Sequence, residues 1–293
     1  MHSTRATLAI DVGASKIAGA LVSEIFEILH HETVPARTEL YAYADPDLAL
    51  TKALIKSLLQ VAKENNITVV KGGACFAEYV TPDQMLNSKD QISWSVQPKI
   101  DFAELSGFSW RIESDVRAMA LAEARASNIN DFLFVTVSSG ISHALVINGK
   151  PWAGATGEAI GFGITQIDST KESPILEQYS SGLGIARRFQ KATNSEVISA
   201  ESIFAQYEEN SHAREIIDSA ANVLGKSLAA MVDYLDPARI VIGGGLWLGS
   251  DLYRNLVLSS YEKYVTKRRQ APEVVNSLAG SNSAVIGAAI AAS

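Results

Sequence analysis

The fold of this chain is decided by the stretch Leu8-Ala9-Ile10-Asp11-Val12-Gly13-Ala14-Ser15-Lys16-Ile17-Ala18-Gly19-Ala20-Leu21-Val22. It consists of an apolar run, a short turn of small and polar residues, and a second apolar run, which predicts a β-hairpin. Small residues let backbone N–H groups approach an anion closely, and a serine adds a hydroxyl donor. The stretch is therefore either an ordinary hairpin or one half of a phosphate-binding site.

The same pattern returns in the second half of the chain, as Phe132-Leu133-Phe134-Val135-Thr136-Val137-Ser138-Ser139-Gly140-Ile141-Ser142-His143-Ala144-Leu145-Val146-Ile147. Two hairpins with small, polar turns could hold one polyphosphate between them. Two unrelated hairpins remain the plain alternative. The choice between these interpretations depends on what surrounds the hairpins in the chain.

Composition limits the classes of protein and partner. At 293 residues the chain is long enough for two domains, and 47% hydrophobic residues supply substantial cores. A formal charge of −7 disfavours nonspecific binding to the backbone of nucleic acid. We therefore expect no nucleic-acid partner.

Cysteine usage and hydropathy point to a cytoplasmic protein. Cys75 is the single cysteine, which excludes a disulfide within the chain and a cysteine metal cluster, and it lies in an apolar run that predicts a buried, inert thiol. No apolar run approaches the roughly 18 residues of a membrane helix, and the N-terminus lacks a signal-peptide pattern. We expect no membrane partner.

Both halves of the chain have the expected order β-β-β-α-β-α, which indicates duplication of an α/β unit. The expected strands cover residues 7–11, 17–22, 26–34, 67–76, 108–113, 132–137, 144–147, 239–242 and 273–277. The expected helices cover residues 47–64, 115–127, 174–190, 200–207, 213–235, 251–265 and 284–292.

Four segments, in order, resemble the ROK family (repressor, open reading frame, kinase), a branch of the actin-like sugar kinases. They are a first phosphate motif at 11–21, a segment around a catalytic aspartate at 113–123, a second phosphate motif at 134–147 with its sequel to Ala155, and an adenosine motif at 241–245. The tail, Ala284-Val285-Ile286-Gly287-Ala288-Ala289, also matches. The resemblance spans nearly the whole chain.

This resemblance implies a fold of two ribonuclease-H-like (actin-like) α/β domains, with ATP and sugar in the cleft between them. We place the N-terminal domain at residues 1–114, completed by the C-terminal helix at 283–293, and the second domain at 115–282. Repressor members carry an N-terminal helix-turn-helix; the first strand here starts within ten residues of Met1, so we do not expect one. We expect a homodimer.

Phosphoryl transfer from ATP to an alcohol needs a cradle for the phosphates, a metal, and an acceptor for the hydroxyl proton. Asp11, at a strand end, is placed to hold Mg²⁺ directly or through water. Asp115 is the candidate general base; its junction of strand and helix is equally suited to an N-cap, and both roles can coexist if Ser114 is the cap. The candidate ATP-binding residues are Asp11, Gly13, Ala14, Ser15, Lys16, Ser138, Ser139, Gly140, Gly243, Gly244 and Gly245.

The candidate substrate residues are Glu78, Asp90, Ser114, Asp115 and Glu177. By resemblance, Asp90 takes the place of an asparagine that binds hydroxyls, and a surface turn is the alternative. Glu177 matches a sugar-binding glutamate, although a carboxylate on an exposed helix face is as plausible. Glu78 is unusual beside a cleft, or only replaces a turn residue.

The chain also departs from the family pattern. Ser138, Ser142, His143 and Ala144 stand where glycine or threonine is usual, and Ala77-Glu78 replaces Pro-Gly.

Two further departures concern the substrate and the metal. The Glu and His that many members use on the sugar align with Gly161 and Ile164, which offer no polar side chain. The histidine and three cysteines of the family's zinc site are missing from 168–174, so we expect no structural zinc.

We therefore expect an ATP- and Mg²⁺-dependent kinase that phosphorylates a hydroxyl of a small polyol: a sugar, an amino sugar or a cyclitol. Because Gly161 and Ile164 would leave glucose hydroxyls unpaired, we expect weak glucokinase activity. The alternative is a non-catalytic sugar- or nucleotide-sensing protein on a decayed kinase fold.

Overall fold

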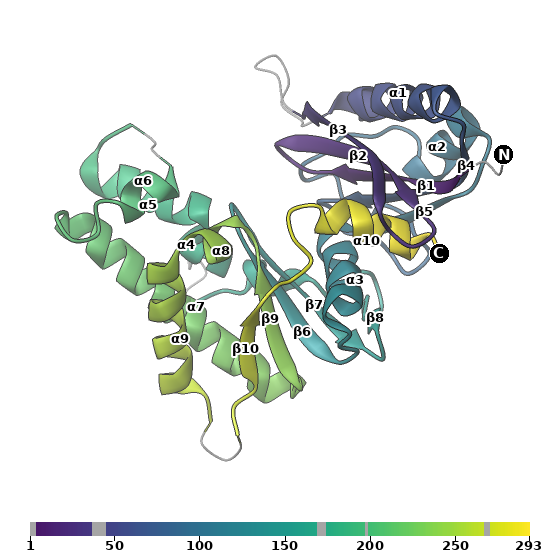
Figure 1. Ribbon diagram of the computed structural model, residues 1–293. Coiled ribbons are helices and arrows are strands. Elements are labelled where there is room, and N and C mark those ends of the chain that lie inside the picture. Colours follow the sequence, from purple (N-terminus) through teal and green to yellow (C-terminus); the bar gives the residue numbers. More distant parts are fainter. Residues whose placement is uncertain (1–3, 37–44, 169–173, 197–198, 267–269) are drawn as a thin grey trace. The chain divides into compact units, whose positions relative to one another are not determined.

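The computed structural model describes residues 4–36, 45–168, 174–196, 199–266 and 270–293. They form two compact units (Figure 1). The first holds the described residues up to Asn130, together with Ile147–Ile160 and Leu278–Ser293, and the second holds Asp131–Val146 and Gly161–Ser277. Residues 115–130 thus group with the first unit, and the domain boundary after residue 114 stays a prediction.

The first unit is built on a sheet of order β3-β2-β1-β4-β5. The expected hairpin is present: β1 and β2 pair antiparallel down to Val12 opposite Ile17, whereas β1, β4 and β5 are parallel. The strands are β1 (Thr4–Val12), β2 (Lys16–Ser23), β3 (Ile28–Pro35), β4 (Ile67–Phe76) and β5 (Trp110–Ser114). Its helices are η1 (Pro46–Leu48), α1 (Ala49–Glu64), α2 (Pro98–Ser106), α3 (Asp115–Ser127) and α10 (Ser283–Ala291).

The two faces of this sheet carry side chains of different size. Side chains alternate across a strand, and in β1 Leu8 and Ile10 pack with α1, while Ala9 belongs to a second cluster with α3 and α10. Figure 1 shows α1 and α10 on opposite faces of the sheet. Because Asp11 follows Ile10 in the alternation, its side chain lies on the α10 face.

The second sheet has the order β10-β9-β6-β7-β8, which is the strand order of the first sheet in the same sequence of elements. This confirms the expected repetition and the α/β fold class. The strands are β6 (Phe132–Val137), β7 (Ile141–Ile147), β8 (Lys150–Pro151), β9 (Arg239–Gly243) and β10 (Glu273–Asn276). The helices are η2 (Gly161–Ile164), α4 (Leu176–Ser180), α5 (Gly182–Thr193), α6 (Ala200–Phe204), α7 (Ser211–Leu235), α8 (Gly245–Gly249) and α9 (Asp251–Tyr264).

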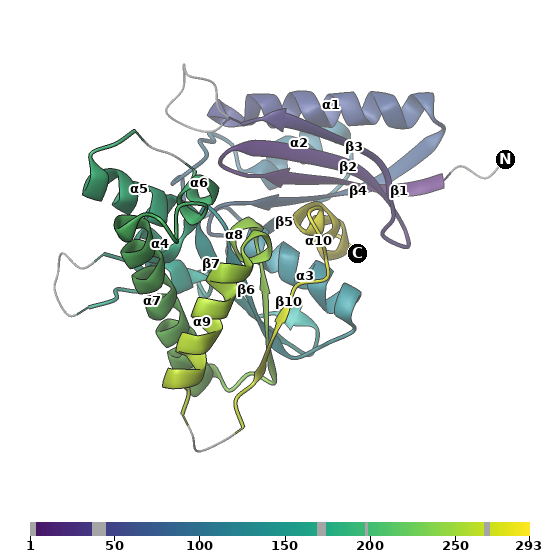
Figure 2. The same cartoon turned by 60° about the vertical axis from the view of Figure 1, so that its left-hand side comes forward.

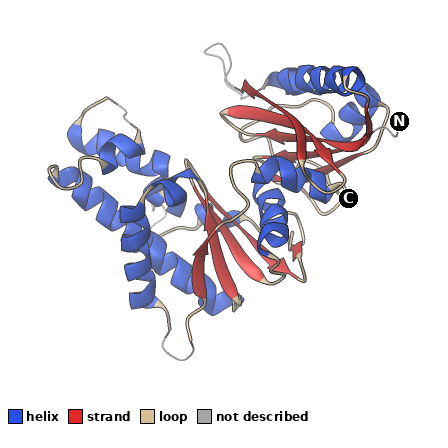
Figure 3. Ribbon diagram, in the orientation of Figure 1, coloured by secondary structure: helices blue, strands red, loops and turns tan. Residues whose placement is uncertain are grey.

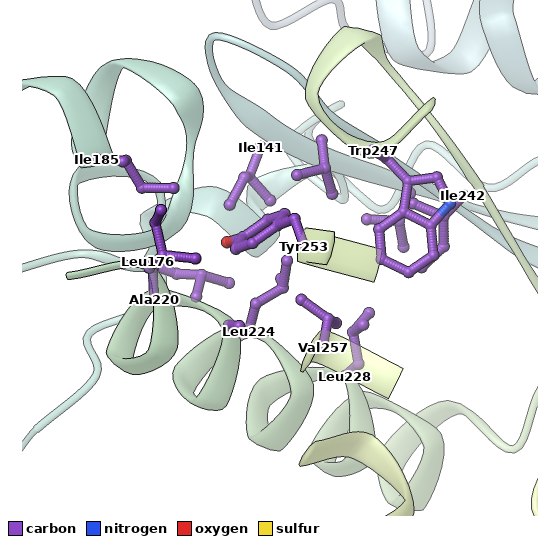
Figure 4. Close-up of a cluster of buried hydrophobic side chains, with 14 of the residues drawn as sticks. Ile141, Leu176, Ile185, Ala220, Leu224, Leu228, Ile242, Trp247, Tyr253 and Val257 are labelled. Carbon is purple, nitrogen blue, oxygen red and sulfur yellow. The ribbon is translucent and has the colours of Figure 1, made fainter. Parts of the chain in front are cut away.

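The core of the second unit lies between its sheet and a layer of helices (Figures 3 and 4). Helices α7 and α9 run side by side (Figures 1 and 2) and approach closely at Gly225, where a Cβ would lie 2.6 Å from the carbonyl oxygen of Val257. Tyr253 of α9 is fully buried and donates its hydroxyl to the carbonyl oxygen of Ser180, 2.6 Å away. The buried polar atom is therefore satisfied.

Several sequence expectations differ from the structure: β8 and α8 were not expected, and two further differences have a local cause. The helix expected at 174–190 is two helices, because Ser181 has an extended backbone and caps α5 by accepting a hydrogen bond from Gly184 N. Helix α2 was not expected: its apolar residues form no clear stripe, although Pro98 at its start and Gly107 after its end are typical boundary residues.

Candidate functional site

The carboxyl ends of β1, β4 and β5 bring the acidic candidates of the first unit to one edge of the sheet. The register places Asp11 beside Cys75, and Cys75 beside Glu113. Asp115 directly follows β5, and Glu78 follows β4 by two residues. The carboxyl edge of a parallel sheet is the usual place for ligands in α/β folds.

Asp11 is held by the neighbouring strand. The Cys75 thiol donates to Asp11 Oδ1 at 3.5 Å and also lies 3.5 Å from the carbonyl oxygen of Ala284. Burial raises the pKa of Asp11 to about 6, against the smaller lowering effects of the thiol and of Lys16. Cys75 is buried, as expected, and burial raises its own pKa well above the ordinary value. Its contact with Asp11 was not foreseen.

Asp115 is the first residue of α3 and is half-buried. The N-cap is Ser114, whose Oγ accepts a hydrogen bond from Arg117 N at 3.4 Å, so the alternative in which Asp115 is the cap is wrong. Asp115 Oδ1 accepts from Val116 N at 2.6 Å. Burial first, and then the charge of Asp11, raise the pKa of Asp115 to about 7. A carboxylate with this pKa can accept a proton near neutral pH.

The Ser114 hydroxyl is fully buried at this cap. Its role in the fold is therefore to start α3, and its contact with substrate stays a prediction.

Arg117 was missed by the sequence analysis. It is 1% exposed, and its guanidinium donates to Glu113 Oε1 at 2.6 Å, to the carbonyl oxygen of Gly157 at 2.9 Å and to that of Val80 at 2.6 Å. It thus ties the start of α3 to two loops. In the sequence, the signal that could have indicated this role was an arginine near the start of an alanine-rich helix.

The first phosphate turn joins β1 and β2. Gly13 N donates to the carbonyl oxygen of Lys16 at 3.1 Å, and the carbonyl oxygen of Ser15 accepts from Ala36 N at 3.1 Å. Ser15 and Lys16 are exposed, and the N–H groups of Ala14 and Ser15 donate to no other residue in the described chain. These N–H groups are available to an anion.

Glu78 is 5% exposed, and both of its carboxylate oxygens are occupied. They accept from the Ser88 hydroxyl and from the backbone N–H groups of Asp90 (3.1 Å), Gln91 (2.6 Å) and Ile92 (2.9 Å). Asp90 itself is exposed. The carboxylate of Glu78 therefore holds the loop that carries Asp90.

In the second unit, the pairing of β6 with β9 brings the second phosphate turn next to the glycine motif. Gly244 has a φ of 96°, and a Cβ there would lie 2.4 Å from the carbonyl oxygen of Val137. A Cβ on Gly245 would lie 3.6 Å from Ser138 Oγ. Ser138–Gly140 and Gly243–Gly245 are thus neighbours, as a shared nucleotide site requires.

The turn at Ser138–Gly140 is itself anchored. Ser138 N donates to the carbonyl oxygen of Gly140 at 2.8 Å, and the Ser138 carbonyl accepts from Gly182 N at 2.8 Å at the start of α5. The N–H groups of Ser139 and Gly140 donate to no other residue within the described ranges. They can face a phosphate.

Glu177 lies against this turn, which was not foreseen. Its Oε2 accepts from Ile141 N at 2.8 Å, and a Cβ on Gly140 would lie 2.6 Å from the same oxygen. His143, in β7, accepts the N–H of Phe162 at its Nδ1, 3.2 Å away.

The structure describes part of the segment, residues 161–174, in which the sequence departs from the family pattern. Gly161 and Ile164 lie in η2, and the Ile164 side chain is 58% exposed. Residues 169–173, where the zinc motif would fall, lie outside the described residues. Within the described part of the chain, no group of three or more His, Cys, Asp or Glu could hold a metal ion, and no helix is long and apolar enough to cross a membrane.

Comparison with known proteins identifies the family. The model of the ROK family matches residues 7–293. The chain belongs to the ROK family. The resemblance seen in the sequence motifs is thereby confirmed.

ROK relatives of the chain include sugar kinases. It is 28% identical over 256 residues to the N-acetylmannosamine kinase of Citrobacter koseri, covering 83% of this chain and 84% of that protein. It is 25% identical over 313 aligned positions to the glucokinase of Streptomyces coelicolor, covering 97% and 96%.

Solved ROK structures share the fold, which is the actin-like two-domain fold. The ROK hexokinase from Thermus thermophilus matches with a TM-score of 0.83 at 22% identity, covering 98% of this chain and 97% of that chain. A ROK family glucokinase from Streptomyces griseus, in complex with glucose and AMPPNP, matches with a TM-score of 0.81 at 22% identity, covering 98% and 99%.

Proposed function

We propose that this protein transfers the γ-phosphoryl group of ATP to a hydroxyl of a small polyol: a sugar, an amino sugar or a cyclitol. The observation that carries the proposal is Asp115, a half-buried carboxylate fixed at the start of α3 with a pKa near neutrality. Two ROK relatives of similar length to this chain are sugar kinases, which supports phosphorylation of a polyol as the reaction class.

In the proposed reaction, Asp115 accepts the proton of the substrate hydroxyl as its oxygen bonds to the γ-phosphorus and the bond to the β–γ bridging oxygen of ATP breaks. ADP leaves with that oxygen, and the proton stays on Asp115. A positioned proton acceptor contributes about 10²–10⁴ in rate. Ser114 and Arg117 keep Asp115 at the end of β5.

The residues present fit a Mg²⁺ ion that arrives with the nucleotide. Such ions keep several waters and need only one or two protein carboxylates besides the phosphates. Asp11, held by Cys75 beside the turn at Gly13–Lys16, would be that carboxylate, directly or through water. The metal would neutralise charge that develops on the phosphates.

For the nucleotide, we propose phosphate contacts from the N–H groups of Ala14 and Ser15 in the first unit and of Ser139 and Gly140 in the second. Backbone N–H groups in tight turns are efficient anion ligands even in an acidic chain. Gly243–Gly245 would let the backbone approach the rest of the nucleotide closely.

For the substrate, we propose contacts from Asp90, Asp115 and the Oε1 oxygen of Glu177. Gly161 and Ile164 supply no polar side chain, and a buried hydroxyl without a partner costs about 1–3 kcal/mol. We therefore propose that glucose is a poor substrate and that a cyclitol or an unusual sugar is turned over better.

The test measures ADP formation by the purified protein with Mg²⁺-ATP across a panel of hexoses, amino sugars and cyclitols, and identifies the phosphorylated product by mass spectrometry. We expect at least one panel member to give product and glucose to give little. Efficient phosphorylation of glucose, with a KM of millimolar or below, would refute the substrate proposal. ADP formation that no polyol stimulates would refute the kinase proposal.

The second candidate function is a non-catalytic sensor of sugar or nucleotide. The altered residues of the second phosphate motif favour it, and a ROK family transcriptional regulator also shares the fold, with a TM-score of 0.82 at 19% identity. A sensor would bind a polyol or ATP in calorimetry without forming phosphorylated product.

A further inference from the structure

We propose that Glu78 is a positioning residue, which shapes the loop at residues 87–92 so that Asp90 is presented to the polyol. The inference rests on the proposed function. It assigns Glu78 a role other than direct contact with substrate.

The Glu78 carboxylate has no free acceptor position left for a substrate. An ionised carboxylate offers about four acceptor positions. Each oxygen of Glu78 accepts two hydrogen bonds: Oε1 from the backbone of Gln91 and Ile92, and Oε2 from the backbone of Asp90 and the Ser88 hydroxyl. A substrate hydroxyl could bind Glu78 only by displacing one of these donors.

Three successive backbone N–H groups, from Asp90 to Ile92, donate to the one buried side chain of Glu78. This arrangement fixes the backbone of Asp90 and hence the direction in which its side chain leaves the loop. The Asp90 carboxylate is exposed and forms no hydrogen bond or ion pair with another residue in the described ranges, so its backbone is what places it. Charge-assisted hydrogen bonds to a buried carboxylate are stronger than neutral ones.

Glu78 also lies close to the proposed base along the edge of the sheet. Phe76 at the end of β4 pairs with Ser114 at the end of β5, and Glu78 and Asp115 follow these strands by two residues and one residue. Through Glu78, the loop is therefore tied to the edge of the sheet where the proposed base lies. A small change in the loop can shift Asp90 relative to the substrate, and misplacement of about 1 Å can cost a large factor in efficiency.

The loop keeps other anchors when Glu78 is altered. Ile92 is fully buried, and Trp94 Nε1 donates to the carbonyl oxygen of Ser88 at 3.1 Å. Gln97 Nε2 donates to the carbonyl oxygen of Leu86 at 3.1 Å. A Glu78→Gln variant should therefore fold with the loop loosened and not unfolded.

The test compares Glu78→Gln with wild type. The amide has one acceptor oxygen, so two of the four donors lose their partner. We expect the KM for the polyol to rise about tenfold, the equivalent of one strong hydrogen bond. We expect kcat and the KM for ATP to change less than about threefold, because contacts made equally in ground and transition state act on KM.

The matched control is Glu123→Gln. Glu123 is 1% exposed, and its Oε2 accepts from the backbone of Leu278 (2.9 Å) and Ala279 (3.1 Å), so it is a buried acceptor of the same kind outside the loop. We expect this control to lower the thermal midpoint and to leave the KM for the polyol unchanged.

Two further variants separate positioning from plain stability. Ser88→Ala removes one donor and should raise the KM for the polyol about threefold, the effect of a single neutral hydrogen bond. In an Asp90→Ala background, Glu78→Gln should have no additional effect on this KM, because residues that act through one another are not additive. Additive effects would overturn the proposal.

Hydrogen–deuterium exchange of residues 86–94 reports on the loop without any activity. Faster exchange at 90–92 in Glu78→Gln, together with the rise in KM, supports the proposal. Faster exchange with an unchanged KM overturns it and leaves the kinase proposal standing. If the wild type phosphorylates no polyol, both the kinase proposal and the proposed role of Glu78 fail. The exchange data then show whether the loop is folded all the same.

Discussion

At the scale of the residue, the central feature is a pair of carboxylates held by neutral partners. Asp11 is contacted by the Cys75 thiol and Asp115 by the Val116 N–H, and neither carboxylate forms an ion pair in the described part of the chain. Burial outweighs the opposing charges of Lys16 and Arg117 and favours the protonated form, which raises the pKa of each carboxyl. Perturbed carboxylates of this kind cluster at functional sites.

The Asp115 side chain gives the first prediction. Asp115→Asn should lower kcat by about 10² or more with folding preserved, because an amide cannot accept the hydroxyl proton. Steady-state kinetics and circular dichroism measure the two quantities. The control is Asp251→Asn, which alters the first residue of α9, the same helix position, outside the proposed site. A near-normal rate in Asp115→Asn would end the case for this base.

Activity should also depend on pH. The pKa of Asp115 is about 7, and a proton acceptor must be ionised before the reaction. We therefore expect kcat/KM for the polyol to be level above this pH and to fall as pH decreases through about 7. The pH profile of the wild type, at saturating Mg²⁺-ATP, checks this. A profile that is level down to pH 5.5 would contradict it.

The same carboxylates make the stability of the folded state depend on pH. Their folded-state pKa values, about 6 and about 7, exceed the ordinary value of 3.8, so the folded state binds these protons more tightly than the unfolded state. This stabilisation is fully present below about pH 4 and is lost as pH rises through 6–7. Asp115→Asn should therefore melt higher than wild type at pH 8 and similarly at pH 4. Equal melting temperatures of Asp115→Asn and wild type at pH 8 would show that the ionised Asp115 carboxylate does not destabilise the folded state.

At the scale of the element, close packing of α10 against the first unit depends on small residues. A Cβ on Gly287 would lie 1.8 Å from the carbonyl oxygen of Ala118 in α3, and one on Gly73 would lie 2.0 Å from that of Ala288. Backbone atoms cannot move aside as a side chain can. The small-residue tail thus keeps α10 close to the helix that begins with Asp115.

This contact predicts the effect of adding one methyl group. Gly287→Ala should lower the free energy of unfolding of the first unit by about 1–3 kcal/mol, the usual cost of overpacking. Chemical denaturation followed by far-ultraviolet circular dichroism measures it. In Gly249→Ala, also in a helix, the new Cβ meets nothing within 4 Å, so this control should be neutral or slightly stabilising. Equal free energies of unfolding for the two variants would contradict the prediction, because α10 would then accommodate the added methyl group without loss of stability.

At the scale of the whole molecule, one strand order occurs twice, and each copy carries a small-residue turn between its first two strands. The first copy adds the carboxylates Asp11 and Asp115, and the second adds the glycine motif at Gly243–Gly245. The repeated fold therefore supplies two turns of the same kind, and the sequence of each copy decides what surrounds its turn.

Metal content is the prediction at this scale. Because the segment at 168–174 contains neither histidine nor cysteine, the purified protein should contain no structural zinc, and its thermal midpoint should be unchanged by a chelator. Metal analysis by mass spectrometry, with the melting curve recorded before and after chelation, checks both. Stoichiometric zinc would contradict the prediction.

The sequence by itself determined the hairpins, the repeated order of elements and the family, because strand alternation, turn residues and motif spacing are local patterns. It also placed Asp11 and Asp115 at the ends of strands. The helix expected at 174–190 and the missed α2 show the limit of such patterns where a cap or a weak apolar stripe decides.

Only the tertiary structure decided which groups these residues meet. Cys75 contacts Asp11 across 64 residues of sequence, Arg117 holds Gly157 across 40, and Glu177 accepts from Ile141 across 36. A local pattern indicates which face a side chain occupies, but not which distant segment covers that face. The partner is set by strand register and helix packing, so the surroundings of each candidate residue emerged only from the folded chain.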